Sequence, residues 1–162
     1  MLAGDPAVIR RIVSSTGFFR ATEVDVAAEL ADERLAKGEA SGYHFVFLDD
    51  AGAGGEGEPG VTARVLGYAC FGPIACTVDS FDLYWIAVDQ SAQGRGLGRR
   101  LMRETEARVA AMGGRRVYIE TSSQPLYEPT RRFYLGCGYA EEARLRDFYT
   151  AGDDKVVYAR RL

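Results

Sequence analysis

The chain has 162 residues, of which 20 are basic and 23 acidic, so its formal net charge is −3. This balance argues against a general nucleic-acid or membrane-surface binder, because such proteins usually carry an excess of positive charge. Hydrophobic residues make up 47% of the sequence. No stretch approaches the roughly 18 consecutive apolar residues that a membrane span requires.

The cysteines and the single histidine restrict the chemistry further. Cys70, Cys76 and Cys137 are odd in number and widely spaced, which favours reduced thiols over a disulfide framework or a zinc site. His44 lies alone in an apolar run, which argues against the usual zinc and Ser-His-Asp sites unless His44 itself is the base. No secretory leader is evident. We therefore expect a cytoplasmic protein with no metal, no nucleic acid and no membrane partner.

Hydrophobic periodicity and turn residues predict two helices and three strands in the first half of the chain. In the first helix Asp5 can cap the N-terminus, Pro6 fits the first turn and Gly17 ends the helix. The acidic, glycine-rich residues 49–60 are expected to form a hairpin loop. The third strand is apolar enough to be buried on both faces. These predicted helices span residues 5–17 and 21–38, and the strands span residues 43–48, 61–71 and 81–88.

The second half of the chain begins with a glycine-rich turn and a third helix. The inner face of that helix is predicted to be Leu97, Leu101, Met102, Thr105, Val109 and Met112. A strand–helix–strand crossover implies parallel pairing in the middle of the sheet. We predict an α/β fold with a mixed central sheet and about four helices, as a single domain over residues 1–162. The later elements are a strand at 115–121, a helix at 127–136, and strands at 139–145 and 155–162 joined by a loop at 146–154.

The glycine turn "SAQGRGLGRRLM", residues 91–102, follows an apolar strand and opens a helix. Its glycine spacing lacks both the lysine of a P-loop and the dinucleotide-binding pattern. Unpaired N–H groups and the helix dipole nevertheless favour an anion at such a turn. Arg95 and Arg99 are placed to meet a phosphate. The alternative is a tight turn with no ligand.

Two motifs resemble those of the GNAT superfamily of acyl-CoA-dependent N-acyltransferases. Residues 93–98, "QGRGLG", match the family's Q/R-x-x-G-x-G/A signature after an apolar strand. Residues 130–139, "TRRFYLGCGY", resemble the family's helix ending in F-Y-x-x-x-G-F, with Tyr139 in the last place. The two motifs stand in the family's order, with a helix and a strand between them. Residues 1–80 agree with the family only in layout.

The resemblance implies how acetyl-CoA is bound as co-substrate. The backbone of residues 94–99 would hold the pyrophosphate, with Gln93 opening the motif. The preceding strand would carry a bulge and pair with pantetheine, and the Val88 amide would stabilise the tetrahedral oxyanion. The cofactor-binding residues that this implies are Ile86, Ala87, Val88, Gln93, Gly94, Arg95, Gly96, Leu97, Gly98, Arg99 and Tyr127.

The resemblance also implies an acid and candidate bases. Tyr134 stands at the position of the family's general acid, which donates a proton to the CoA thiolate. Its alternative role is packing. Asp82 stands where some members carry a catalytic glutamate, and its shorter side chain would act through a water. Glu120 is a second candidate, although either carboxylate could be structural and ordered water alone could serve.

Two departures from the family accompany the match. Only four residues precede the first helix, so the family's first strand is missing or very short. A partner subunit, as in a homodimer, could then cover the exposed sheet edge. At the place of an asparagine that contacts the cofactor in many members, this chain has Tyr127, which could still line the pantetheine channel.

The acceptor is expected to be a small or amino-acid-like primary amine. The segments expected around its cleft carry carboxylates and aromatic rings, which suit a cation. A peptide or protein amine is the alternative acceptor, and a non-catalytic acyl-CoA-binding domain is the alternative function. The residues concerned are Asp79, Asp82, Asp147, Asp153, Asp154, Tyr84, Trp85, Phe148 and Tyr149, with Asp153 and Asp154 also explained by a solvated turn.

Overall fold

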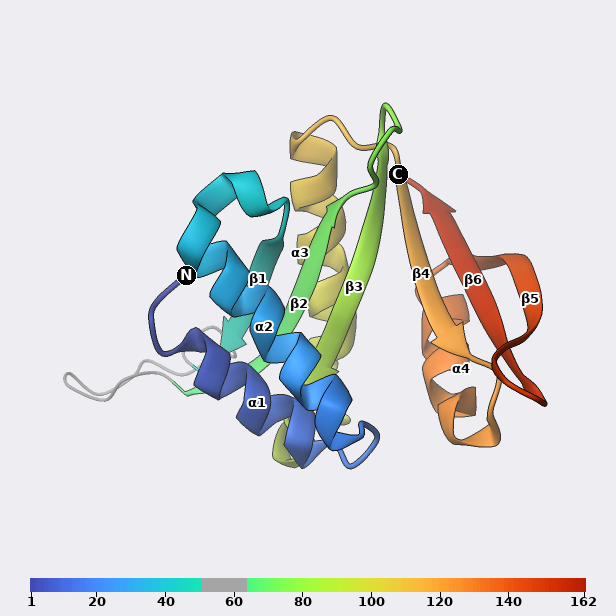
Figure 1. Cartoon of the computed structure of the whole chain (residues 1–162), viewed down its shortest axis with the longest axis horizontal. Coiled ribbons are helices and arrows are strands. Elements are labelled where there is room, and N and C mark those ends of the chain that lie inside the picture. The colour runs from blue at the N-terminus through green and yellow to red at the C-terminus, as the bar shows by residue number, and fades with distance from the viewer. Residues whose placement is uncertain (51–63) are drawn as a thin grey trace. The chain divides into compact units, whose positions relative to one another are not determined.

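The computed structural model describes residues 1–50 and 64–162 (Figure 1). Most of the predicted hairpin loop, residues 51–60, lies outside the described residues. No helix in the described part of the chain could span a bilayer. The helices are α1 (Asp5–Ser15), α2 (Ala21–Lys37), α3 (Leu97–Ala111) and α4 (Glu128–Gly136), with short 3-10 helices at Gly38–Ser41, Gln90–Ala92 and Pro125–Tyr127. The strands are β1 (His44–Asp49), β2 (Val65–Pro73), β3 (Ser80–Val88), β4 (Arg116–Ser122), β5 (Ala140–Thr150) and β6 (Asp153–Arg161).

The six strands form a mixed sheet in the order β1-β2-β3-β4-β6-β5, which confirms the predicted fold class. β3 and β4 are parallel, with Asp82 opposite Tyr118. β1 pairs with β2, β4 with β6, and β5 with β6, all antiparallel. The parallel pair is the one that the strand–helix–strand crossover predicted. Among the described residues no strand precedes α1.

The chain divides into two compact units. Unit 1 comprises residues 1–71 and 85–105, and unit 2 comprises residues 72–84 and 106–162. β3 and α3 each contribute residues to both units, so the division does not separate two independent segments of the chain. Each unit is described below by itself.

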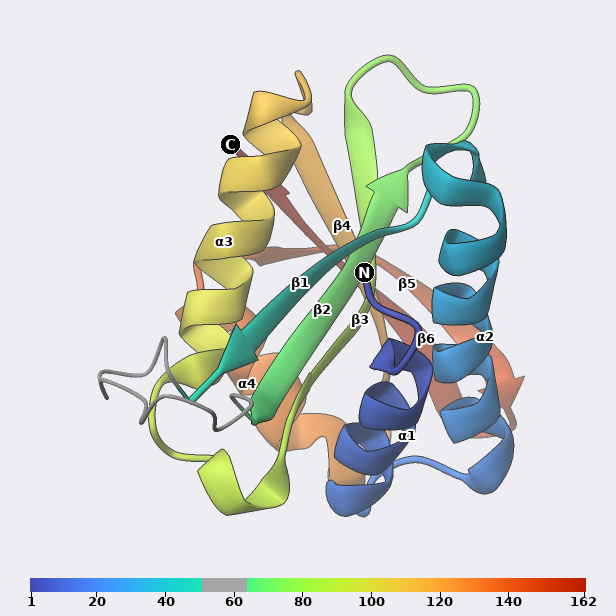
Figure 2. The same cartoon turned by 90° about the vertical axis from the view of Figure 1, so that its left-hand side faces the viewer.

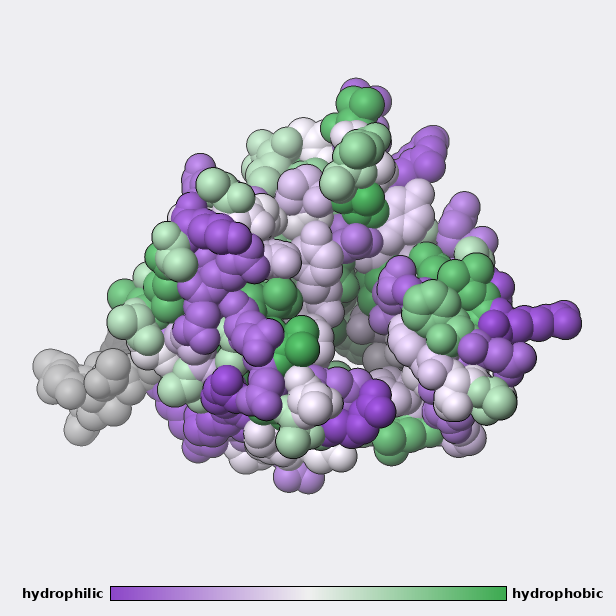
Figure 3. All heavy atoms as spheres, viewed as in Figure 1, coloured by the Kyte–Doolittle hydropathy of each residue, from purple (hydrophilic) through white to green (hydrophobic). Residues whose placement is uncertain are grey.

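Unit 1 is built around the α1–α2 hairpin. These helices lie on one face of its strands and α3 lies on the other (Figure 2). Hydrophilic side chains cover much of the outer surface of α1 and α2 (Figure 3). Their inner surfaces are apolar, and each fully buried Ile or Val contributes about 2 kcal/mol. The core consists of Ile9, Ile12, Val13, Val24, Ala27, Ala31, Phe45, Tyr68, Cys70 and Ala87.

Unit 2 has a sheet whose two faces differ sharply. We call one the helix face, because α4 and the end of α3 pack on it through the Tyr134–Tyr158 ring contact and the Glu106–Arg160 ion pair. We call the other the open face, because its side chains are exposed or half-buried. The helix face includes Phe81, Leu83, Val117, Ile119, Thr121, Val156, Tyr158 and Arg160, and the open face includes Asp82, Arg116, Tyr118, Glu120, Lys155, Val157, Ala159 and Arg161.

Four details differ from the sequence predictions. Gly4, not Asp5, is the N-cap of α1, and the Asp5 carboxylate accepts the Leu2 N–H at 2.6 Å. β3 is not buried on both faces, because Tyr84 is 38% exposed. Met112 lies beyond the end of α3 and is exposed. The predicted loop at 146–154 is mostly strand, because β5 continues to Thr150 through an irregular register.

Candidate active site

The glycine turn before α3 presents an array of unpaired backbone donors. Gly94 and Gly96 have φ angles of 75° and 76°, in the left-handed region that side chains disfavour. Within residues 1–50 and 64–162, the N–H groups of residues 94–98 have no hydrogen-bond acceptor. They stand at the positive end of the α3 dipole. The turn is therefore suited to bind an anion with several oxygen atoms.

Asp89 anchors this turn, and the sequence analysis missed it. It is 3% exposed and accepts from Ser91 N and Oγ at 3.0 and 2.6 Å. Arg11 and Arg64 both form ion pairs with its other carboxylate oxygen. These hydrogen bonds, from Ser91 first and then the arginines, lower the pKa of Asp89 to about 2. The partners are Arg11 of α1 and Arg64, the residue just before β2, so no local pattern indicated them.

The strand that leads into the turn is held by a close approach. A Cβ on Gly67 of β2 would lie 3.0 Å from the Ala87 oxygen and 3.2 Å from Leu101 Cδ1. Gln93 Nε2 donates to the Val88 carbonyl at 3.3 Å. Because Gly67 has no side chain, β3 and α3 can pack closely against β2, and this packing fixes the position of Val88 and the turn. All predicted cofactor-binding residues from Ile86 to Arg99 lie together in unit 1.

Tyr134 lies in unit 2, on the buried side of α4. It is 5% exposed, and its ring centroid is 5.9 Å from that of Tyr158 and 6.4 Å from that of Tyr139. Burial, with a smaller contribution from Cys137, raises the pKa of the Tyr134 phenol. The phenol is therefore protonated at neutral pH. The helix ends at Gly136 with Cys137 as its C-cap, and Gly138 follows with a φ of 86°, which explains the glycine in the second motif.

Hydrogen bonds from Arg131 hold the start of α4 near the end of β4. Arg131 Nη1 donates to the carbonyl oxygens of Ser122 and Gln124 at 2.8 and 2.9 Å. Tyr127 is the N-cap of α4 and is half-buried. The position of Tyr134 therefore depends on a residue of its own helix that the sequence analysis did not single out.

The two candidate bases have different surroundings on the open face. Burial, together with the neighbouring Glu120 carboxylate, raises the pKa of Asp82 to about 6, although Lys155 opposes the shift. Glu120 itself forms an ion pair with Lys155 at 2.6 Å. A carboxylate with a pKa near 6 can both take and release a proton at neutral pH, whereas Glu120 is engaged by a cation. The surroundings favour Asp82 over Glu120 as a base.

The phenol and the carboxylates lie on opposite faces of the unit 2 sheet. Tyr134 contacts Tyr158 on the helix face, while Asp82 is opposite Tyr118 on the open face.

Three of the other predicted acceptor residues have partners within the chain. Asp153 is buried, not solvated, and accepts from Ser122 Oγ at 2.6 Å. Asp154 forms an ion pair with Arg144. Trp85 packs on Phe19 with ring centroids 5.5 Å apart. Asp82 therefore stands out among the predicted acceptor residues.

The family is decided by comparison with known proteins. The model of the acetyltransferase (GNAT) family matches residues 13–139. The chain belongs to the GNAT family. It is therefore an acyltransferase, and the glycine turn and the α4 motif are its family motifs.

Solved structures agree with the GNAT assignment. A protein from Desulfovibrio desulfuricans assigned to the GNAT family of acetyltransferases is 47% identical, with a TM-score of 0.89, over 99% of this chain and 94% of that one. An aminoglycoside 6'-N-acetyltransferase complexed with coenzyme A has 16% identity and a TM-score of 0.72, over 99% and 92%. A protein from Bacillus anthracis assigned as a streptothricin acetyltransferase, in complex with acetyl coenzyme A, has 14% identity and a TM-score of 0.56, over 63% and 58%. A search of curated proteins finds no match.

Proposed function

We propose that this GNAT protein transfers the acetyl group of acetyl-CoA to the primary amine of a small or amino-acid-like molecule. The observation that carries the proposal is the run of unpaired amides over residues 94–98 at the start of α3. These donors suit a pyrophosphate, and Arg95 and Arg99 add positive charge. Two of the similar structures named above hold coenzyme A or acetyl coenzyme A, which supports the same donor.

In the proposed reaction, the amine lone pair attacks the thioester carbon and the carbonyl becomes an oxyanion. The Val88 amide stabilises that charge. The carbon–sulfur bond then breaks, and the Tyr134 phenol gives its proton to the CoA thiolate. Asp82 lies six residues before Val88 on β3, about 20 Å away in an extended strand, so it takes the proton of the amine through a chain of waters. The raised pKa of Tyr134 keeps the phenol protonated until the thiolate forms, and the pKa of Asp82 near 6 suits a base at neutral pH.

The finer parts of the proposal concern the acceptor and the cellular setting. A peptide or protein amine, or acyl-CoA binding without catalysis, are the competing functions. Aminoglycoside acetyltransferases among the similar structures favour a small amine. We further propose that the whole chain acts as one catalytic domain, that it is cytoplasmic in keeping with its three free cysteines, and that it can form a homodimer.

Replacing Tyr134 tests the catalytic proposal. Tyr134→Phe is expected to lower kcat by about a hundredfold or more, the usual contribution of a general acid, with the dissociation constant for acetyl-CoA unchanged. Thiol-release assays with acetyl-CoA and a panel of amines measure kcat, and calorimetry measures binding. Tyr158→Phe removes a hydroxyl from the same ring cluster and serves as the control. Equal turnover of Tyr134→Phe and wild type would show that Tyr134 is not the acid.

The acceptor panel separates the alternatives. Turnover of small amines supports the proposal, whereas turnover of peptides alone points to a peptide or protein acceptor. Binding of acetyl-CoA with no turnover of any amine points to a non-catalytic binding domain.

A further inference from the structure

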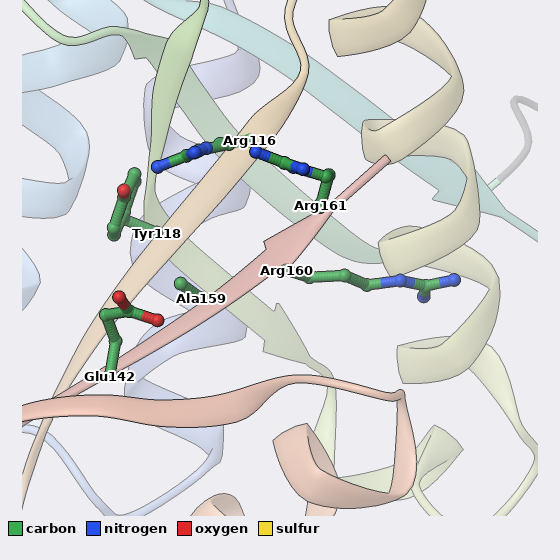
Figure 4. Close-up of a pocket in the computed structure, with 6 residues that line it drawn as sticks. All are labelled: Arg116, Tyr118, Glu142, Ala159, Arg160 and Arg161. Carbon is green, nitrogen blue, oxygen red and sulfur yellow. The ribbon is translucent and has the colours of Figure 1, made fainter.

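A pocket of about 220 Å³ opens on the open face of unit 2, on the other side of the sheet from Tyr134 (Figure 4). Its floor is Ala159 of β6, whose partner on β5 is Ala140. Two small residues side by side leave the hollow that the longer neighbours surround. The lining residues are Arg116, Tyr118, Glu142, Ala159, Arg160 and Arg161.

Two arginines give this pocket its charge. Arg116 and Arg161 are directly opposite each other on β4 and β6, and like charges in that position repel. In Figure 4 the Arg161 side chain reaches from β6 toward β4, on the side where Arg116 and Tyr118 lie. Within residues 1–50 and 64–162, neither arginine forms an ion pair. Arg116 donates a hydrogen bond to the Tyr118 hydroxyl, and this bond, with smaller contributions from the Asp79 and Glu142 carboxylates, raises the pKa of Arg116. These groups offset part of the repulsion, and a bound anion would relieve the rest.

The other polar residues of the pocket are partly engaged. Arg160 extends away from the pair, donating to Glu106 Oε1 at 3.0 Å and to the Cys137 carbonyl at 2.8 Å. Glu142 stands on the β5 side, with its carboxylate toward Ala159 (Figure 4). The pocket thus offers two guanidinium groups and the Tyr118 phenol on one side and a carboxylate on the other. Guanidinium groups recognise carboxylates through paired N–H donors.

The pocket lies next to the candidate base. Asp82 is opposite Tyr118 in the β3–β4 register, and Arg116 is two residues before Tyr118 on β4. Standard strand spacings put the Cα atoms of Asp82 and Arg116 about 8 Å apart. One molecule of amino-acid or dipeptide size is long enough for its carboxylate to contact the two arginines at one end while its ammonium group contacts Asp82 at the other.

We propose that Arg116 and Arg161 bind a carboxylate of the acceptor whose amine faces Asp82, so that the acceptor is an amino acid or short peptide and not a simple polyamine or aminoglycoside. This inference rests on the proposed acetyl transfer. It adds two specificity residues that lie outside both family motifs.

Matched acceptors test the proposal. L-lysine is compared with cadaverine, L-tyrosine with tyramine, and glycylglycine with its amide, so that each pair differs only in the carboxylate. For at least one pair, the KM of the acid is expected to be about tenfold or more lower, the size of a charge-assisted hydrogen bond. Equal or inverted KM values in all three pairs would overturn the proposal.

Arginine variants test which residues are responsible. Arg116→Gln and Arg161→Gln are expected to raise the KM of the acid about tenfold, with kcat and the KM of the matched amine unchanged. Arg146→Gln removes the same charge from β5 and is the control. Thermal melting checks that each variant folds. A preference that survives both pocket variants, or that Arg146→Gln also removes, would contradict the proposal.

A direct measurement separates this proposal from acetyl transfer. If no amine is acetylated although acetyl-CoA binds, the proposed function fails. The pocket is then judged by NMR titration with N-acetylglycine. Shifts at Arg116, Tyr118 and Ala159 that Arg116→Gln abolishes support a carboxylate site, and unchanged spectra overturn it.

Discussion

The glycine turn of unit 1 and the proposed acid and base residues of unit 2 are built in different ways. The turn works through backbone N–H groups, which Gly94 and Gly96 expose by adopting left-handed conformations. Tyr134 and Asp82, the proposed acid and base, are side chains on opposite faces of a sheet, where strand register decides what each one faces. Backbone recognition can be encoded in six consecutive residues, whereas the side-chain site depends on elements far apart in the sequence.

Gly96→Val is the strongest way to break the turn. A β-branched residue at a φ of 76° is strained, and the amides on either side would be misaligned. The loss of about two charge-assisted hydrogen bonds should weaken acetyl-CoA binding about a thousandfold in calorimetry.

Gly152→Val is the matched control for that experiment. Gly152 has a φ of 79° and, like Gly96, has no atom within 4 Å of the position that a Cβ would take, but it lies in the β5–β6 turn. Acetyl-CoA affinity should be unchanged. Equal weakening by both variants would mean that lost stability, and not the donor turn, causes the effect.

Asp82→Asn probes the side-chain site. Because the pKa of Asp82 is about 6, its carboxylate forms as the pH rises through 6, and kcat should rise over the same range. The variant is expected to lose this rise and about a hundredfold in kcat at pH 7.5. Rates measured between pH 5 and 8 check this. If Glu120→Gln removes the rise and Asp82→Asn keeps it, Glu120 is the base.

Asp89→Asn tests how much the Asp89 carboxylate stabilises the fold around the turn, as distinct from the binding of acetyl-CoA by the backbone of the turn. The pKa of Asp89 is lowered to about 2, below its unfolded value near 4, so its ion pairs stabilise the fold above pH 4. In urea titrations at pH 7, the free energy of unfolding of the variant should be about 2 kcal/mol lower than that of the wild type. The difference should shrink as the pH falls from 4 to 2. A difference that persists at pH 2 would exclude the charge as its origin.

Gly67→Ala gives the smallest expected effect. Its Cβ would meet the backbone oxygen of Ala87 at 3.0 Å, so β3 must shift by a few tenths of an ångström. We expect a loss of about 1 kcal/mol in stability and a modest rise in the KM for acetyl-CoA. Gly4→Ala, with no neighbour within 4 Å, is the control. No change in either quantity would show that β3 adapts freely.

These contrasts also explain what the sequence could predict. Helix boundaries to within two residues, the parallel β3–β4 pair and both motifs were predictable, because periodicity and glycine spacing are local, whereas the Asp5 cap was wrong. Asp89 was missed, since its arginine partners are 78 and 25 residues away. The burial of Asp153 was not predicted, since it depends on tertiary packing. The pocket lined by Arg116 and Arg161 could not be predicted, because it depends on the pairing register of β4 and β6, which the sequence does not reveal.

The partners of Asp89 have a consequence for how the protein folds. Arg11 closes a loop of 78 residues onto Asp89, and Arg64 adds a contact from the start of β2. Contacts of such high sequence separation form only when the chain has collapsed. A peptide spanning residues 85–105 should therefore not bind acetyl-CoA. In the intact chain, a ligand that binds only the native turn stabilises α1 and β2 with it, so acetyl-CoA should slow amide hydrogen exchange in α1 and β2 as well as in the turn.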